Sequence, residues 1–286
     1  MTNATGSAMP DVFLKDRSLL FVSGAEAQSF LQNLITTDIV ALEPDEARPG
    51  ALLTPQGKIL FDFIIWQEVG GYAIETDASQ RDGLLKRLTM YKLRAAVTLA
   101  PHAEEGVTVS WGADANGARD SRFAKAGITL TRRAGRHGDD AEALYDALRI
   151  RHGIVTSGPD FALQDAFPHD VLMDLNGGLS FKKGCYVGQE VVSRMQHRGT
   201  ARRRVVTVSA ATALPETGTE ITAAGKPVGT LGSVEGDKGL AIVRIDRVGA
   251  AIAADTPLLA GETPVSLALP EWSGLVFPTS ADEASA

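Results

Sequence analysis

The residue best suited to chemistry is the single cysteine of the chain, Cys185. Lys182 and Lys183 precede it, and glycines stand at Gly184 and Gly188. The residues that follow are expected to form a helix, whose first backbone N–H groups favour negative charge. With the lysines, this setting would favour the thiolate, the form of cysteine that attacks electrophiles and binds metals. The glycines would let the backbone approach a ligand closely.

Two interpretations of Cys185 stay open from local chemistry alone. In the first it is a small buried apolar residue, the usual situation of a free cysteine. In the second it is a functional thiolate. One thiol cannot hold an iron–sulfur cluster alone, because such clusters take about four ligands. Another chain or a small thiol would have to supply the others.

A basic run is the second chemical feature, and only Glu190 opposes it. It consists of Lys182, Lys183, Arg194, Arg198, Arg202, Arg203 and Arg204. In a chain of net charge −7, it could bind a polyglutamate tail, an RNA phosphate or an acidic partner. It could equally be a solvated strand face. Direct RNA binding is not expected, because the run lacks an aromatic platform on which bases stack.

Among the acids, Asp62 is the most informative, because it lies in an apolar run between Phe61 and Phe63. Its carboxylate would either face a pocket or cap a strand edge, and we favour the pocket. The five histidines show no paired metal-ligand spacing, so a metal site built by this chain alone is not expected. The sequence shows no Ser-His-Asp arrangement, phosphate-binding loop or dinucleotide fingerprint.

Composition limits the class of protein. The 286 residues suffice for two domains or one large one, and 44% of them are hydrophobic. No apolar stretch reaches the roughly 18 residues of a membrane span, so no membrane partner is expected. The first ten residues do not resemble a secretory signal. A single cysteine fits a reducing compartment, and we therefore expect a cytoplasmic location.

The elements that would position these residues can be read from the hydrophobic pattern. Strands are expected over 48–54 and 58–67, joined by a turn at Pro55-Gln56-Gly57. A helix is expected over 187–196. Its apolar face would contain Val187, Val191, Val192 and Met195.

Helix starts and the C-terminal region can also be predicted. Asp77 and one of Asp139 or Asp140 are expected to cap helices. A loop-rich stretch follows from 156 to 180. Beyond Gly199, short β-like runs separated by glycine and proline indicate a small barrel or sandwich.

The cysteine segment closely resembles the signature of the YgfZ family, folate-binding relatives of the glycine-cleavage T-protein, an aminomethyltransferase. The matching residues run from Phe181 to Glu190 and continue to Arg194 and Arg198-Gly199. Three further segments agree, 30–38, 53–62 and 91–94. Arg151 to Ile154, followed by Gly158 and Asp160, and the run 176–181 resemble the mitochondrial-type iron–sulfur assembly branch.

The resemblance implies an α+β fold of three subdomains around a central folate-sized channel, the last subdomain a β-barrel. Residues 11–198 would form the folate-binding region of two α/β subdomains, and 199–278 the barrel. Residues 1–10 and 279–286 would be flexible tails. The implied function is assembly, maturation or repair of [4Fe–4S] proteins, including tRNA-modifying enzymes. The implied partners are iron–sulfur assembly or client proteins.

The resemblance also assigns roles to residues. Cys185 would be the reactive thiolate, able to share an iron–sulfur cluster with a partner, and Lys183 would tune it. Tetrahydrofolate or a related folate would be the small-molecule ligand. Its pocket would be lined by Asp62, Arg94, Arg151, Tyr186, Gln189 and Glu190.

Two departures from the T-protein leave enzyme activity open. The T-protein has adjacent acids where this chain has Phe61-Asp62, and a folate-gripping glutamate where this chain has Arg151. An arginine cannot accept the hydrogen bonds that a pterin ring donates to a carboxylate. The alternative function is a tetrahydrofolate-dependent aminomethyltransferase or other one-carbon transferase. In it Asp62 would serve as acid, base or electrostatic group, and a lipoyl carrier would be the partner.

Overall fold

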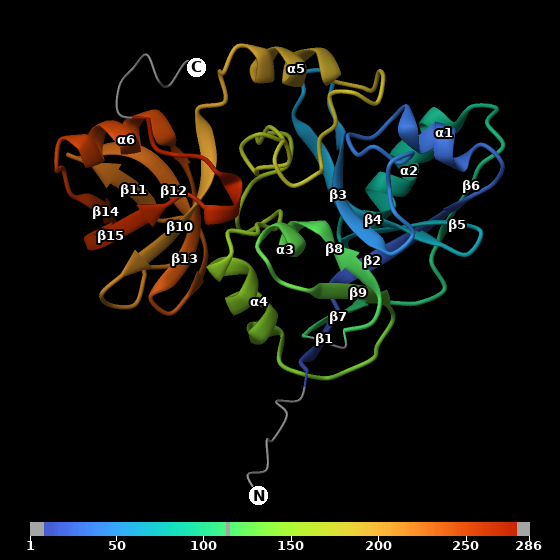
Figure 1. Ribbon diagram of the computed structural model, residues 1–286, viewed down its shortest axis with the longest axis horizontal. Coiled ribbons are helices and arrows are strands. Elements are labelled where there is room, and N and C mark those ends of the chain that lie inside the picture. Colours follow the sequence, from blue (N-terminus) through green and yellow to red (C-terminus); the bar gives the residue numbers. More distant parts are fainter. Residues whose placement is uncertain (1–8, 113–114, 279–286) are drawn as a thin grey trace, which may run out of the picture.

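The computed structural model describes residues 9–112 and 115–278, and it consists of a nine-stranded sheet and a closed six-stranded barrel (Figure 1). This confirms the α+β fold with a C-terminal barrel. The tails predicted at 1–10 and 279–286 fall almost wholly outside the described residues. None of the described helices is both long and apolar enough to cross a membrane.

The large sheet has the strand order β1-β7-β9-β8-β3-β4-β5-β2-β6. Its strands are β1 (Asp11–Leu14), β2 (Arg17–Ser23), β3 (Glu46–Leu53), β4 (Ile59–Glu68), β5 (Gly71–Asp77), β6 (Thr98–Pro101), β7 (Val107–Trp111), β8 (Ala118–Asp120) and β9 (Leu130–Ala134). The helices around it are α1 (Ala27–Gln32), α2 (Arg81–Lys92), α3 (Ser121–Lys125) and α4 (Glu142–Arg151).

The alternation of side chains along β4 explains why the sheet has a core on each face. Phe63 and Ile65 belong to one buried cluster with α1 and α2, whereas Ile64 and Trp66 belong to the opposite one. Successive side chains of a strand point to opposite faces, so a continuous apolar run serves both layers. The β3–β4 hairpin predicted around Pro55-Gln56-Gly57 is confirmed, and the Thr54 N–H donates to the Lys58 carbonyl at 2.8 Å.

The barrel has the order β10-β13-β12-β11-β14-β15. Its elements are β10 (Arg203–Ala210), β11 (Glu220–Ala223), β12 (Lys226–Glu235), β13 (Lys238–Arg244), β14 (Leu258–Ala260) and β15 (Thr263–Ala268), with α6 (Ile245–Ala253) and the 3-10 helix η1 (Glu271–Ser273). Figure 1 shows the barrel beside the sheet, with α5 (Gln189–His197) across the top of the intervening loops.

Those loops, from 152 to 188, form a third layer with its own apolar cluster. Phe161, Met173 and Tyr186 pack there with Val192 of α5 and Val205 of the barrel. The loop-rich prediction is confirmed, and the loops are ordered because they fill the space between sheet and barrel.

Three local predictions need correction. Asp77 ends β5 rather than capping a helix, and α2 begins after Gln80, which makes no side-chain cap. Asp140 accepts a hydrogen bond from the Asp11 N–H at 2.8 Å, and α4 begins after Ala141. Asp77 accepts from the Ser79 N–H two residues on, and Asp140 is engaged by the backbone of β1, so neither carboxylate caps a helix. Helix α5 begins at Gln189, two residues later than predicted, because Gly188 adopts φ 80°.

Candidate functional site

Cys185 is exposed, in the irregular segment between the loop layer and α5. The interpretation of this cysteine as a buried apolar residue is therefore wrong. It lies four residues before Gln189, the first residue of α5, and so outside the first helical turn. The neighbouring Tyr186 is buried, which anchors the segment beside the exposed thiol.

Lys183 fixes the cysteine segment to the segment after α1. Its ammonium group donates to the carbonyl oxygens of Gln32, Ile35 (2.7 Å) and Thr37 (3.0 Å). Burial lowers the pKa of Lys183 from 10.5 to about 8, against the opposing charge of Asp38. All three N–H donors of the ammonium group therefore bond backbone carbonyls. The positive charge of Lys183 lies beside the backbone of the segment after α1.

Gln32 completes this junction between two parts of the chain that are distant in sequence. Its amide nitrogen donates to the Lys183 carbonyl at 3.3 Å and to the Asp38 carboxylate at 3.0 Å. The Ser180 N–H donates to the Thr36 carbonyl at 3.0 Å. The 30–38 and 181–190 motifs therefore form one structural unit.

The β3–β4 turn supports the other side of the cysteine segment. A Cβ at Gly188 would lie 2.6 Å from the Thr54 carbonyl oxygen, and one at Gly57 would lie 3.0 Å from Val191. Both glycines have φ close to 80°, a conformation that favours glycine. The turn and the start of α5 are in close contact because neither residue has a side chain.

Two buried groups hold the base of this assembly. The Tyr186 hydroxyl donates to the Ser180 carbonyl at 2.9 Å, and burial raises the pKa of Tyr186. His169 is fully buried, and its Nε2 lies 3.1 Å from the Gln196 side-chain oxygen of α5. Burial lowers the pKa of His169, so the ring is neutral near pH 7.

The basic run divides into paired and unpaired residues. Arg204 is buried and bonds the Asp174 carboxylate at 2.7 Å, Arg203 pairs with Asp165, and Arg194 pairs with Glu190 at 2.7 Å. Within the described residues, the members without an ion pair are Lys182, Lys183, Arg198 and Arg202. Glu190, expected in the ligand pocket, is instead exposed on α5.

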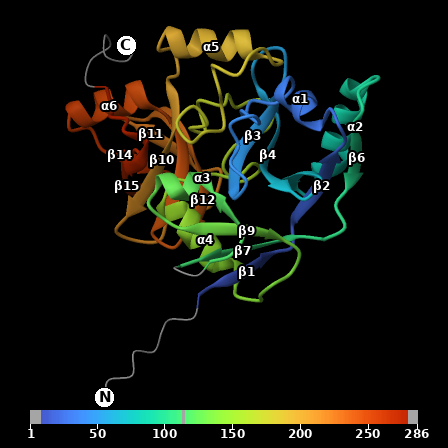
Figure 2. The same ribbon diagram turned by 45° about the vertical axis from the view of Figure 1, so that its right-hand side comes forward.

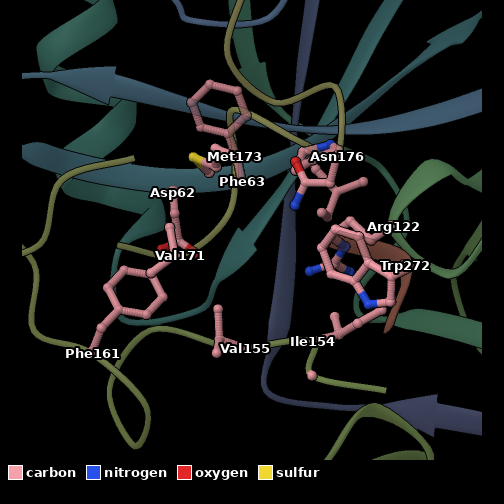
Figure 3. A pocket seen from close by; sticks show the side chains of 13 residues that line it. Asp62, Phe63, Arg122, Ile154, Val155, Phe161, Val171, Met173, Asn176 and Trp272 are labelled. Atoms are coloured by element: carbon pink, nitrogen blue, oxygen red, sulfur yellow. The ribbon is translucent and has the colours of Figure 1, made fainter. Parts of the chain in front are cut away.

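A central cavity lies between the sheet, the loop layer and η1, and Asp62 lines it as predicted (Figure 3). Its volume, as the space that water can occupy, is about 30 Å³. The lining residues are Pro49, Asp62, Phe63, Ile64, Arg122, Gly153, Ile154, Val155, Phe161, Val171, Met173, Asn176 and Trp272. Figure 3 shows the apolar side chains that line this space, among them Phe63, Phe161 and Trp272.

Asp62 belongs to a small polar group at this cavity. The Gln80 amide nitrogen lies 2.9 Å from the Ser157 hydroxyl and 3.4 Å from the Asp62 carboxylate. The Gln80 amide oxygen is buried and has no hydrogen-bond partner in the described part of the chain. Of this group only Asp62 lines the cavity, and its carboxylate could accept a hydrogen bond from a small polar ligand.

The remaining residues predicted for the pocket lie elsewhere. Arg94 is exposed after α2, and Gln189 begins α5; neither lines the central cavity. Arg151 ends α4 and lines a separate groove against the barrel. The cation of the central cavity is Arg122, which sequence reasoning missed. Its guanidinium is bonded to Asp120 at 2.7 Å, and the Asp-Ser-Arg order of a helix start was the available signal.

The central cavity does not fit a folate in this structure. A space of about 30 Å³ for water centres admits roughly two waters, and a pterin ring is far larger. Arg151, which the resemblance would place in the folate pocket, lines the other groove and supplies no acceptor here. Space and donor chemistry therefore both disagree with the expected folate pose.

The comparisons with known proteins agree with this architecture. Residues 202–275 match the family model described as CAF17, C-terminal beta-barrel domain. The human mitochondrial iron–sulfur cluster assembly factor IBA57 is 31% identical over 285 residues, covering 85% of this chain and 80% of that protein. The mitochondrial IBA57 homolog from Phaeosphaeria nodorum is 32% identical over 223 residues. The match covers 68% of this chain and 54% of that protein.

A solved structure shows the fold of the whole chain. The glycine cleavage system aminomethyltransferase T from Bartonella henselae matches with a TM-score of 0.70, covering 93% of this chain and 87% of that one, at 16% identity. This likeness concerns the fold alone. It confirms the T-protein-like arrangement implied by the motifs.

The cytoplasmic location expected from composition is contradicted by these comparisons, since the IBA57 relatives are named mitochondrial. A single free thiol fits any reducing compartment, so composition could not separate the two. The chain is 31% identical to the human protein, and its barrel matches the CAF17 family. The sequence motifs meet around Cys185 in the structure. The chain therefore belongs to the IBA57 family of iron–sulfur cluster assembly factors.

Proposed function

We propose that this chain assists the assembly of iron–sulfur proteins, and that Cys185 supplies one thiolate to a cluster shared with a partner protein. The observation that carries the proposal is the exposure of Cys185 in a segment otherwise anchored by buried contacts. A thiolate on a fixed backbone can enter the coordination sphere of a cluster on another chain without reorganising its own.

The partner must supply the other ligands. The described residues contain no group of three histidine, cysteine or acidic side chains placed to hold a metal. A cluster takes about four ligands, so a bridged complex is the arrangement that one thiol allows. On binding, the Cys185 thiol gives its proton to solvent and its sulfur forms one Fe–S bond, with no change of oxidation state required.

The charges around the thiol favour an acidic partner. Lys182 is exposed and lacks an ion pair within the described residues, and the half-buried Lys183 adds its charge beside it. Such a local basic surface on a net-acidic chain steers an acidic face towards it. Lys183 is a positioning residue in this proposal, because its contacts are to the backbone of the neighbouring segment.

The cellular test measures a [4Fe–4S] enzyme such as aconitase in cells lacking this protein. Cells complemented with wild type are expected to regain activity, and cells carrying Cys185→Ser are not. Serine is nearly the same size as cysteine, and the site is exposed, so the variant should fold. Clients that modify tRNA are part of the proposal, and the level of their tRNA products is a second readout.

The outcomes separate the two parts of the proposal. Full recovery with Cys185→Ser would remove the thiol from the function and keep the assembly role. No effect of the deletion on any [4Fe–4S] enzyme would remove the assembly role itself. In purified protein, a cluster-bearing partner should protect Cys185 from alkylation, whereas the apo partner should not.

One observation favours the alternative of a one-carbon transferase: Asp62 lies on the wall of the central cavity of a T-protein-like fold. A carboxylate there could act on a substrate amine. The purified chain would then make methylene-tetrahydrofolate from a loaded lipoyl carrier. Turnover abolished by Asp62→Asn would establish this activity, and its absence would eliminate it.

A further inference from the structure

One motif found in the sequence, residues 91–94, lies outside both the cysteine segment and the central cavity. It forms the end of α2 and the start of the connection to β6, and Figure 2 shows these elements with α1 at one side of the sheet. One face of α2 is buried through Leu84 and Leu88. On the other face Met90 is 61% exposed, and Leu93 just after the helix is 87% exposed. Large apolar side chains left together in water are typical of an interaction surface.

Leu93 also has a strained backbone, with φ 46° and ψ −107°. This conformation favours glycine, because a Cβ approaches neighbouring backbone atoms there. A leucine at this position costs folding energy, and its exposed side chain returns none through packing. Strain of this kind is typical of positions that contact a ligand or a partner.

A third exposed apolar residue lies at the same end of the sheet. Ser23 of β2 pairs with both Gly71 of β5 and Thr98 of β6. The turn between β4 and β5 is therefore about 10 Å from the connection between α2 and β6, because one strand separates them. Val69 in that turn is fully exposed. The α2-end surface is defined by these apolar residues and three cations: Val69, Met90, Leu93, Lys86, Lys92 and Arg94.

The cations of the α2-end surface are unpaired within the described residues. Lys86 and Arg94 are exposed and Lys92 is half-buried, and none of the three forms an ion pair there. Arg81, at the start of the same helix, pairs with Asp82 at 2.9 Å. On a chain of net charge −7, this surface is a local positive patch with apolar side chains in it. Its complement is an acidic surface that also carries apolar side chains.

Helix α1 connects the α2-end surface to the cysteine segment. At its start, the Glu26 carboxylate accepts from the Ala96 N–H at 2.6 Å. At its end, the Gln32 amide donates to the Lys183 carbonyl at 3.3 Å. The six-residue helix between these contacts is about 9 Å long. A standard protein interface covers about 800 Å² per partner, roughly 30 Å across, so one partner can reach both Cys185 and this surface.

We propose that the α2-end surface is where the partner iron–sulfur protein docks, and that the partner presents to it an acidic surface with exposed apolar side chains. The identity of the partner rests on the proposed function, whereas the chemistry of the docking surface does not. Met90 and Leu93 are buried against the apolar side chains of the partner, and the three cations pair with its acids. Docking here places the cluster of the partner within reach of Cys185.

The chemistry is tested with a defined probe, a fluorescein-labelled amphipathic helical peptide with glutamates on one face and leucines on the other. Fluorescence anisotropy at low salt measures its Kd for the full chain. We expect saturable binding that weakens as salt is added. A peptide with serine in place of leucine should bind about tenfold more weakly, and one with lysine in place of glutamate should not bind.

Leu93→Gly separates binding from folding. Glycine removes the apolar contact and relieves the strained backbone, so the affinity should fall about tenfold while the melting temperature rises. Arg94→Glu replaces an attraction with a repulsion and should also weaken binding about tenfold. The matched controls are Ile252→Ser and Lys226→Glu, an exposed apolar residue and an exposed cation of the barrel region, which should leave Kd unchanged. Cys185→Ser should bind the peptide as wild type does.

Two results of the titration would overturn the inference. One is no saturable binding of the glutamate–leucine peptide at millimolar concentration in low salt. The other is binding that Leu93→Gly and Arg94→Glu both leave intact. Loss of that binding in Ile252→Ser or Lys226→Glu would then assign the acidic ligand to the barrel region.

The role of the surface in assembly is tested in cells lacking this protein. At equal protein level, the Leu93→Gly and Arg94→Glu double variant should restore much less aconitase activity than wild type. Full recovery with the double variant, where Cys185→Ser fails, would contradict docking at this surface and leave the thiol in its role. If the deletion has no effect, the proposed function fails, and the peptide titration alone decides the docking surface.

Discussion

At the scale of single residues, the contrast between Cys185 and Lys183 explains the site. Cys185 is exposed, whereas Lys183 two positions earlier is drawn inward to three backbone carbonyls. Gln32 ends α1, and Ile35 and Thr37 lie in the turns that follow, so one cation satisfies carbonyls of the helix end and of the loop beyond it. The lysine thereby holds the segment from which the cysteine projects.

Lys183→Met tests this anchoring. The methionine keeps the apolar length of the side chain but leaves three carbonyls without their donor. We expect the free energy of unfolding to fall by about 2 kcal/mol, measured by urea denaturation. Lys182→Met is the matched control, since Lys182 is exposed, and should change stability by less than about 0.5 kcal/mol. Equal effects of the two variants would contradict the anchoring role.

At the scale of elements, α5 is attached by few contacts. Of its residues only Val192 is buried, and the His169–Gln196 contact ties its last turn to the loop layer. His169 faces Asp174 and Arg204, whose charges act on it in opposite directions, while burial dominates. The attachment of α5 therefore depends on a buried imidazole, whose charged form is disfavoured by burial although it could still donate to Gln196.

This dependence predicts a loss of stability in mild acid. Because the folded-state pKa of His169 lies below the unfolded value of 6.5, the unfolded chain binds more protons as pH falls below about 6.5. Stability is thus complete above that pH and decreases below it, by at most about 1.4 kcal/mol per pH unit from this group. His169→Asn keeps an amide donor for Gln196 and should flatten the profile between pH 7 and 5.5.

Urea unfolding at a series of pH values measures the effect. His137→Asn is the control, because His137 is exposed, and its profile should follow wild type. An unchanged slope in His169→Asn would mean that other groups control the acid sensitivity.

At the scale of the whole molecule, a buried polar junction joins sheet and barrel. Arg149 of α4 donates to Asp160 at 2.9 Å and to the Ser233 hydroxyl of β12 at 2.8 Å. Asp160 also accepts from the Ser233 N–H at 2.7 Å. The junction keeps the barrel against α4, and thus shapes the groove that contains Arg151.

Arg149→Leu should weaken this junction strongly. Removing one partner of a buried pair leaves an uncompensated Asp160 and typically costs about 3–5 kcal/mol. Calorimetry should show a lower melting temperature, with the barrel unfolding at a lower temperature than in the wild type. Arg136→Leu breaks an exposed pair with Asp139 and should change stability by less than about 1 kcal/mol. A single unshifted transition in Arg149→Leu would contradict the prediction.

The sequence by itself predicted most of the elements and singled out Cys185 as the candidate for chemistry. The apolar runs of β3 and β4, the turn at 55–57 and the short β-rich runs of the barrel are local patterns, and the structure follows them. Two expected helix caps were wrong because their carboxylates bind other backbone groups. Asp77 accepts from the Ser79 N–H two residues on, a local competition, whereas Asp140 accepts from the Asp11 N–H, which only the fold brings close.

Only the tertiary structure decided which residues share a site. In the structure, Lys183 bonds the backbone of the 30–38 motif. The central cavity has little free space, and Arg151 lines a different groove together with Trp272. Packing of loops between sheet and barrel sets these distances. Such packing depends on contacts between residues more than a hundred positions apart, which no local sequence pattern encodes.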